Sequence, residues 1–153
     1  FIHSGFELQE TYPVNTGLDF TSDELIKYPS EKLPLFSEYA YDWSRRSHII
    51  DWIRKILKIR LQHMELITNS DPKTFFLLET NNSNIIGIKR ATKYSKRLFG
   101  YFNTNFKKME WLNTPLKEKL KFQQLIGDHE IIQKNKYLQY KMNPGESLIL
   151  CGD

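Results

Sequence analysis

The pattern of hydrophobic positions changes its period near residue 70. Before that point, between Ser44 and Met64, apolar residues recur about every 3.6 positions, which predicts one amphipathic helix. Its apolar stripe spans residues 49–60, and its opposite face is basic. Asp51 lies in the first predicted turn and Arg60 in the last, where the helix dipole favours each charge. We therefore expect a helix that packs through one face and leaves the other in solvent.

Beyond residue 70 the apolar positions follow a period of two, which is typical of β-strands. The predicted strands span residues 75–80, 85–91, 97–103, 106–112, 119–126, 136–142 and 147–151. Turns that contain Asn or Gly separate them. Short strands at close spacing are characteristic of an antiparallel β-sandwich. The predicted fold class is therefore mostly β: an antiparallel β-sandwich preceded by a long loop and one amphipathic α-helix.

Residues 1–43 follow neither period. The opening residues are interpreted as the end of a buried strand that stops at Gly5, and residues 6–42 as a long connection. Within it, Thr21 begins a short helix that is predicted to reach Lys27. A strand that ends at a glycine and continues into a long loop is how an α/β barrel brings residues to the mouth of its active site.

The net charge of +4 is distributed unevenly over the 153 residues. Residues 1–42 hold eight acidic residues against two lysines, so the remainder of the chain carries a net charge of +10. A basic body suggests nucleic acid as a partner, but the bases are spread along the chain and no nucleic-acid-binding motif accompanies them. We interpret them as a solvated surface and predict no nucleic-acid partner.

Composition excludes several other classes of protein. Hydrophobic residues make up 40% of the chain, which suffices for a packed core. The one cysteine, Cys151, excludes an internal disulfide, and the four scattered histidines form no metal-ligand motif. The longest apolar runs, such as residues 148–151, are too short to span a bilayer. We predict no cofactor, no metal and no membrane partner.

Several short motifs, taken in order, resemble the C-terminal portion of glycoside hydrolase family 13, the α-amylase superfamily. Residues 1–7, FIHSGFE, resemble the last strand of the family's catalytic barrel and the Gly-x-Glu turn after it. Residues 49–60, which end in Ile-Arg, resemble the last barrel helix. The segments that resemble strands and turns of the family's C-terminal domain are 85–91, 98–103, 122–127 and 137–150. The resemblance covers nearly the whole chain.

The resemblance implies two parts. Residues 1–66 would be the remnant of a catalytic (β/α)8 barrel, and residues 67–153 a C-terminal β-sandwich that braces it. In this family the catalytic carboxylates lie at the ends of earlier barrel strands, and an Asn-His-Asp motif precedes the last strand. This sequence contains no Asn-His-Asp triplet, and nothing positions Glu7 and Glu10 as the pair about 5 Å apart that a retaining glycosidase needs. No catalytic residue is therefore assigned, and the missing barrel is the expected partner.

The loop after the last barrel strand opens on the barrel mouth, so its residues are candidates for contact with the sugar. The candidates are Glu7, Tyr12, Asn15 and Trp43. Packing is the alternative role, above all for Trp43. The resemblance implies an α-glucan as the substrate of the parent enzyme. The Phe-Glu-Leu-x-Glu pattern at residues 6–10 also resembles the glucan maltosyltransferase branch, so hydrolysis and glycosyl transfer both stay open.

Two alternatives to a purely bracing role are kept. The sandwich can be an autonomous module that binds a glycan or a protein. The helix stripe at residues 49–60 can also mediate self-association, because each large apolar residue left in water forfeits roughly 1.5–3 kcal/mol. We therefore expect the stripe either to pack on the sandwich or to pair with another copy of the chain.

Overall fold

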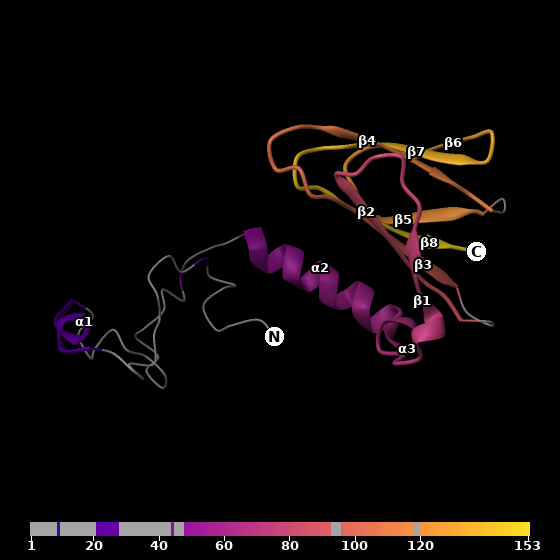
Figure 1. The fold of residues 1–153 in the computed structure, drawn as a ribbon. Coiled ribbons are helices and arrows are strands. Elements are labelled where there is room, and N and C mark those ends of the chain that lie inside the picture. Colours follow the sequence, from indigo (N-terminus) through magenta and orange to yellow (C-terminus); the bar gives the residue numbers. More distant parts are fainter. Residues whose placement is uncertain (1–8, 10–20, 28–43, 45–47, 93–95, 118–119) are drawn as a thin grey trace. The chain divides into compact units, whose positions relative to one another are not determined.

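The structure is a computed structural model that describes residues 9, 21–27, 44, 48–92, 96–117 and 120–153. Contacts divide the chain into two compact units, residues 1–59 and residues 60–153. The boundary falls inside a helix, which therefore begins in the first unit and ends in the second. The elements of each unit are drawn in Figure 1.

The short helix predicted to end at Lys27 is present as α1 (Ser22–Lys27). Thr21 and Glu24 form a reciprocal capping box at its start. The Thr21 backbone N–H donates to Glu24 Oε2 over 2.9 Å, and the Glu24 backbone N–H donates to Thr21 Oγ1 over 3.4 Å. The hydrogen bonds from Thr21, that of its backbone first, hold the pKa of Glu24 below its ordinary value. Every residue of this helix is exposed, so the cap rather than burial defines where it begins.

The amphipathic helix is present but is shorter than predicted. It begins at His48 rather than at Ser44, and α2 spans His48–Gln62. The helix breaks at His63, whose backbone angles (φ −122°, ψ 27°) depart from helical values. A separate short helix, α3 (Met64–Ile67), follows the break.

The apolar stripe of α2 is only partly covered. Its half-buried members are Ile49, Ile53 and Ile59. Its exposed members are Trp52 (43% exposed), Ile56 (51%) and Leu57 (46%). Pairing of this stripe with a second copy of the chain stays a prediction.

The described part of the second unit contains eight strands. A short 3-10 helix, η4 (Pro72–Thr74), precedes them. The strands are β1 (Phe75–Leu78), β2 (Ile85–Arg90), β3 (Arg97–Asn103), β4 (Glu110–Pro115), β5 (Phe122–Ile126), β6 (Ile132–Lys134), β7 (Tyr137–Met142) and β8 (Ser147–Gly152). Six of them, all but β4 and β6, coincide with predicted segments apart from shifts at their ends.

Two strands differ from the sequence prediction. The strand expected at residues 106–112 is displaced, and β4 begins only at Glu110. Asn105 Oδ1 accepts hydrogen bonds from the backbone N–H groups of Lys107 and Lys108, which makes this stretch a turn. The sequence pattern does not predict β6, because its three residues are all exposed and show no alternation.

The strands form two antiparallel sheets. The larger sheet has five strands in the order β1-β2-β3-β8-β5, and the smaller sheet has three in the order β4-β7-β6. Every strand pair is antiparallel, and the two sheets face each other (Figure 1). The predicted class, mostly β with antiparallel sheets in a sandwich-like arrangement, is thus confirmed.

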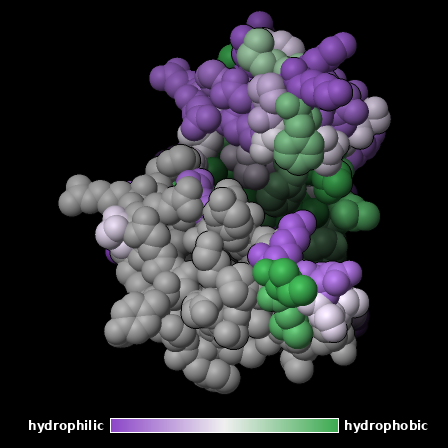
Figure 2. All heavy atoms as spheres, turned by 90° about the vertical axis from the view of Figure 1, so that its left-hand side faces the viewer, coloured by the Kyte–Doolittle hydropathy of each residue, from purple (hydrophilic) through white to green (hydrophobic). Residues whose placement is uncertain are grey.

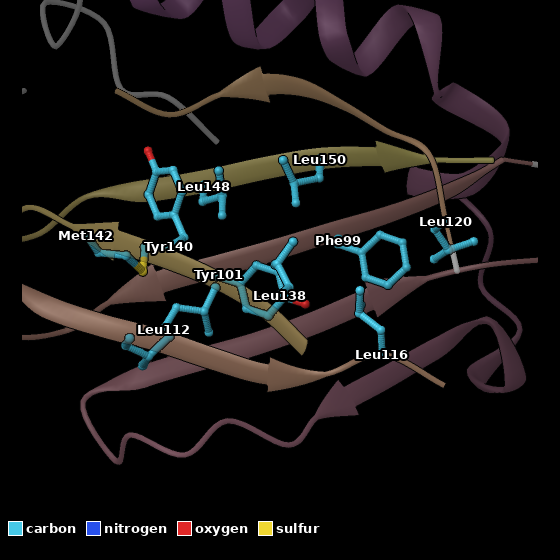
Figure 3. Packing of buried hydrophobic residues seen from close by; sticks show 11 residues of the cluster. Phe99, Tyr101, Leu112, Leu116, Leu120, Leu138, Tyr140, Met142, Leu148 and Leu150 are labelled. Atoms are coloured by element: carbon cyan, nitrogen blue, oxygen red, sulfur yellow. The ribbon is translucent and has the colours of Figure 1, made fainter. Parts of the chain in front are cut away.

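The core lies between the two sheets, and side chains from both point into it (Figure 3). Its fully buried members are Tyr101, Leu148 and Leu150 of the larger sheet and Leu112, Leu138, Tyr140 and Met142 of the smaller one. Burial raises the pKa of Tyr101 to about 12, although a hydrogen bond with Thr114 opposes the shift. The Thr114 hydroxyl donates to the Glu79 carbonyl over 2.6 Å, as expected for a polar group inside a core.

Candidate functional site

The residues predicted to contact the sugar lie outside the described residues; they are Glu7, Tyr12, Asn15 and Trp43. In the ranges that the structure does describe, no group of three or more His, Cys, Asp or Glu side chains could hold a metal ion. No helix of the described part is long and apolar enough to cross a membrane. Other features of the described residues are two polar clusters, the outer faces of the sheets and a cleft beside α3.

The first polar cluster is centred on Glu146, between β7 and β8. Its carboxylate accepts hydrogen bonds from the Tyr140 hydroxyl over 2.6 Å and from the backbone N–H of Asp128 over 3.0 Å. The Asn143 backbone N–H donates to its second oxygen. Both carboxylate oxygens are therefore occupied by groups of the chain itself. The cluster fixes the loop after β5 against the turn before β8, and it leaves Glu146 poorly placed to exchange protons with a substrate.

The second polar cluster is centred on Glu110, the first residue of β4. Its carboxylate accepts hydrogen bonds from three side-chain amides, those of Asn82 (2.7 Å), Asn84 (2.8 Å) and Asn105 (2.9 Å). These bonds, that from Asn82 first, hold the pKa of Glu110 below its ordinary value. The cluster ties the β1–β2 and β3–β4 loops together, so Glu110 also has a structural role.

The outer side of the larger sheet is mostly apolar, although Arg90 and Ser147 also lie on it. Residues opposite each other in an antiparallel pair share a face, and Leu77 lies opposite Ile88 in this register. The outer apolar face consists of Phe75, Leu77, Ile86, Ile88, Leu98, Phe102 and Ile149. Leu77 is 76% exposed, Ile86 50% and Phe75 42%. Figure 2 shows one side of the surface, on which hydrophobic residues (green) are exposed beside hydrophilic ones (purple).

The α3–η4 segment covers one end of the outer apolar face. Leu66 of α3 is buried against Leu98 and Cys151, with Ile67 and Leu125 beside them. Arg90 fixes the same segment, since its guanidinium donates to the Asn69 carbonyl over 2.9 Å. This burial raises the pKa of the Cys151 thiol, so the thiol is a packing group rather than a nucleophile. The rest of the face has no such cover among the described residues.

A cleft of about 560 Å³ opens beside α3. His63, Glu65 and Lys96 supply its charged and titratable groups, and Leu66 and Leu125 line its apolar part. Burial, followed by the charge of Lys96, lowers the pKa of His63. Because this pKa is lowered, the imidazole is neutral at pH 7. A neutral histidine beside a lysine can take part in packing or in ligand binding, but it is not the carboxylate pair that glycoside cleavage requires.

The sequence does contain a signal for the outer apolar face. The runs IIGI in β2 and LFGYF in β3 are apolar at consecutive positions rather than at alternate ones. Continuous apolar runs are typical of strands that are covered on both sides. The period of two alone predicts that β2 and β3 are ordinary sandwich strands. It does not reveal that both sides of these strands are apolar.

Comparison of the chain with known protein families finds no family model that matches, and comparison with curated proteins finds no match either.

Proposed function

We propose that the chain is a non-catalytic part of an α-glucan-active enzyme of the glycoside hydrolase family 13 type, in which the sandwich braces the catalytic barrel. The observation that carries this proposal is the outer apolar face of the larger sheet. An antiparallel sheet in a two-layer sandwich ordinarily turns polar residues outwards. Here most of the outward positions are apolar over several strands, as they are when a further layer of protein packs on the sheet.

The free energy that would be gained by burying the outer apolar face favours a permanent partner. Full burial of a Leu or Ile side chain stabilises a structure by roughly 1.5–3 kcal/mol relative to leaving it in water. Leu77 and Ile86 remain 76% and 50% exposed, so a covering layer would recover much of that energy. In the proposed enzyme, the barrel is that layer.

Two of the described carboxylates, those of Glu110 and Glu146, are in keeping with a non-catalytic role for this part of the enzyme. A retaining glycosidase needs two carboxyl groups roughly 5 Å apart across the scissile bond. Glu110 and Glu146 are each held by several hydrogen bonds from their own chain. The chemistry is therefore assigned to the barrel. Whether water or a sugar hydroxyl completes the reaction, as in a hydrolase or a glucan maltosyltransferase, depends on that barrel.

The test uses the polypeptide encoded by the full natural reading frame alongside the 153-residue chain. We expect the longer polypeptide to act on amylose, as followed by release of reducing ends or by redistribution of chain lengths. The 153-residue chain alone should neither release reducing ends nor redistribute chain lengths. Catalysis by the 153-residue chain, or a reading frame without barrel strand–helix units upstream of Phe1, would overturn the proposal.

A matched pair of variants in the longer polypeptide tests the bracing contact. Leu77→Lys combined with Ile86→Lys should lower the melting temperature by several degrees, because charges would be buried against the barrel. Met109→Lys is the control, since Met109 is 55% exposed in the β3–β4 loop, outside the outer apolar face. Equal melting temperatures for the double variant and the control would contradict the bracing role.

A further inference from the structure

The outer side of the smaller sheet differs in character from that of the larger one. The register of β4 and β7 pairs Trp111 with Lys141, Asn113 with Gln139, and Pro115 with Tyr137. The β6 strand adds Ile132 beside Gln139 and Lys134 beside Tyr137. The alternate residues of β4 and β7, such as Leu112 and Leu138, are buried in the core. The side chains named first therefore share the outward side, which we call the aromatic–amide face.

Aromatic rings mark both ends of this face. Trp111 is 58% exposed and Tyr137 is 43% exposed. Their positions differ by four residues in the register of β4 and β7, which corresponds to about 13 Å along the strands. An exposed ring on a flat sheet presents an apolar surface with a polar edge. Two such rings in line can each stack on a ring-shaped group of one extended ligand.

Amide groups occupy the space between the rings. Asn113 and Gln139 lie opposite each other in the middle row of the face. The Asn113 Oδ1 atom is shielded from solvent and, among the described residues, has no hydrogen-bond partner. A buried acceptor without a partner is unfavourable. The atom is closed to solvent in this conformation, so ligand binding is inferred from the exposed rings and from the amide row as a whole. Amides also both donate and accept hydrogen bonds, which matches the chemistry of sugar hydroxyls.

A groove of about 360 Å³ continues the face at its Tyr137 end. Leu116 and Tyr137 give it an apolar wall, and its ammonium groups come from Lys117, Lys134 and Lys136. Asn135 and Lys136 connect β6 to β7 with positive φ angles of 51° and 64°, as in a type I′ turn. This tight turn holds the groove wall in a fixed position relative to the sheet.

We propose that the aromatic–amide face binds a linear glycan, with sugar rings stacked on Trp111 and Tyr137 and hydroxyl groups bonded to Asn113 and Gln139. The distribution of charge favours a glycan over a nucleic acid. A nucleic acid carries a phosphate at every unit and is bound by cations along its path. Here neutral amides occupy the centre, and the lysines lie at the ends. The choice of an α-glucan among linear glycans rests on the proposed function; the binding face itself does not.

Affinity electrophoresis of the 153-residue chain in gels that contain amylose tests this proposal. The wild-type chain should be retarded. Trp111→Ala and Tyr137→Ala should each weaken the apparent affinity about tenfold, because each removes one stacking surface. Trp111→Phe should restore most of the binding. Phe106→Ala is the matched control: Phe106 is 81% exposed but belongs to the β3–β4 loop, and its loss should leave retardation unchanged.

The possible results separate this proposal from the proposed function. Retardation in a gel of β-linked glucan alone, abolished by Trp111→Ala, would support the glycan face and contradict an α-glucan enzyme. If Trp111→Ala and Tyr137→Ala leave the retardation unchanged, the aromatic–amide face is not the glycan-binding surface. The absence of retardation in every glycan gel would also overturn the proposal. A salt-sensitive shift with single-stranded oligonucleotides alone would assign the face to nucleic acid and also overturn the proposal. Thermal melting of each variant confirms that it is folded.

Discussion

At the scale of single residues, the buried Tyr140 hydroxyl explains how the Glu146 carboxylate is held in place. Tyr140 is fully buried, yet its hydroxyl oxygen serves three partners. It donates to Glu146 over 2.6 Å and accepts from the backbone N–H groups of Asp128 (2.7 Å) and His129 (2.9 Å). Burial first, and then the Glu146 carboxylate, raise the pKa of Tyr140 to about 12. This hydroxyl therefore stays protonated and acts as the connector of the cluster.

Removal of that hydroxyl should destabilise the sandwich. In Tyr140→Phe, the two backbone donors and the Glu146 carboxylate lose a shared partner, which is expected to cost about 1–3 kcal/mol. Urea denaturation followed by tryptophan fluorescence measures the change. Tyr137→Phe is the control, because Tyr137 is 43% exposed and its hydroxyl should contribute within about 0.5 kcal/mol. Equal losses in the two variants would show that the buried cluster is not stabilising.

The Cys151 thiol should be inert in the folded chain. Cys151 is 3% exposed, and burial raises its pKa, so the thiolate that reacts with disulfide reagents is scarce and inaccessible. Its reaction with Ellman's reagent should be slow in buffer and fast in urea above the unfolding midpoint. A fast reaction under native conditions would mean that the α3 segment does not stay docked over the larger sheet.

At the scale of elements, the β6–β7 hairpin holds a non-glycine residue where a glycine is usual. Lys136 has φ 64° at the second central position of the turn, and Asn-Gly is the common pair there. Lys136→Gly should remove the strain of the left-handed conformation and stabilise the chain by about 0.5–1 kcal/mol. Asn135→Gly should change stability less, because Asn tolerates this conformation. Thermal or urea unfolding measures the stability of Lys136→Gly. A variant less stable than the wild type would contradict the prediction.

The docking of α3 should depend on pH through His63. Its pKa is lowered, by burial first and by Lys96 second, so the folded chain binds a proton less readily than the unfolded chain. Above about pH 7 both states are neutral at this residue. As the pH falls through about 6.5 towards the lower folded pKa, the unfolded chain is protonated first and stability declines. Lys96 and Glu65 are the other charged residues that line the cleft.

Comparison of urea midpoints at pH 7 and pH 5.5 measures this dependence. In His63→Gln the part of the decline that comes from the imidazole should disappear, whereas in a variant of another histidine, His129→Gln, it should persist. Identical slopes for the wild type and His63→Gln would contradict the assignment to His63.

At the scale of the whole molecule, apolar surface remains on both units. On α2, Trp52, Ile56 and Leu57 are exposed, and the larger sheet carries its outer apolar face. Exposed apolar patches of this kind mark sites of protein–protein contact. In the proposed enzyme both surfaces belong against the barrel, and without it they are available to a second copy of the chain.

The 153-residue chain should therefore self-associate. Sedimentation velocity should show larger species whose share grows with protein concentration. Ile56→Glu combined with Leu57→Glu should shift the chain towards the monomer, because each residue removes roughly 1.5–3 kcal/mol of potential burial. Lys58→Glu, on the exposed polar side of α2, is the control. A wild-type chain that is monomeric at every concentration would contradict the prediction.

Local sequence patterns were sufficient to predict most of the helices and strands. The period of 3.6 located α2, the period of two located β1, β2, β3, β5, β7 and β8, and the Thr21–Glu24 capping pair located α1. These features depend on neighbours in sequence, so a single chain reveals them. The break at His63 and the later start of β4 did not appear in the pattern, because a backbone turn and the side-chain hydrogen bonds of Asn105 decide them.

The sequence by itself thus determined the class of the fold, the positions of its main helix and most strands, and the absence of an Asn-His-Asp motif. Only the tertiary structure decided which strands are neighbours, and therefore which residues share a face. The rows that join Leu77 to Ile88 and Trp111 to Lys141 arise from pairings between strands. Such pairings are set by register and packing over the whole sheet. A surface built from several strands is therefore visible only once the chain has folded.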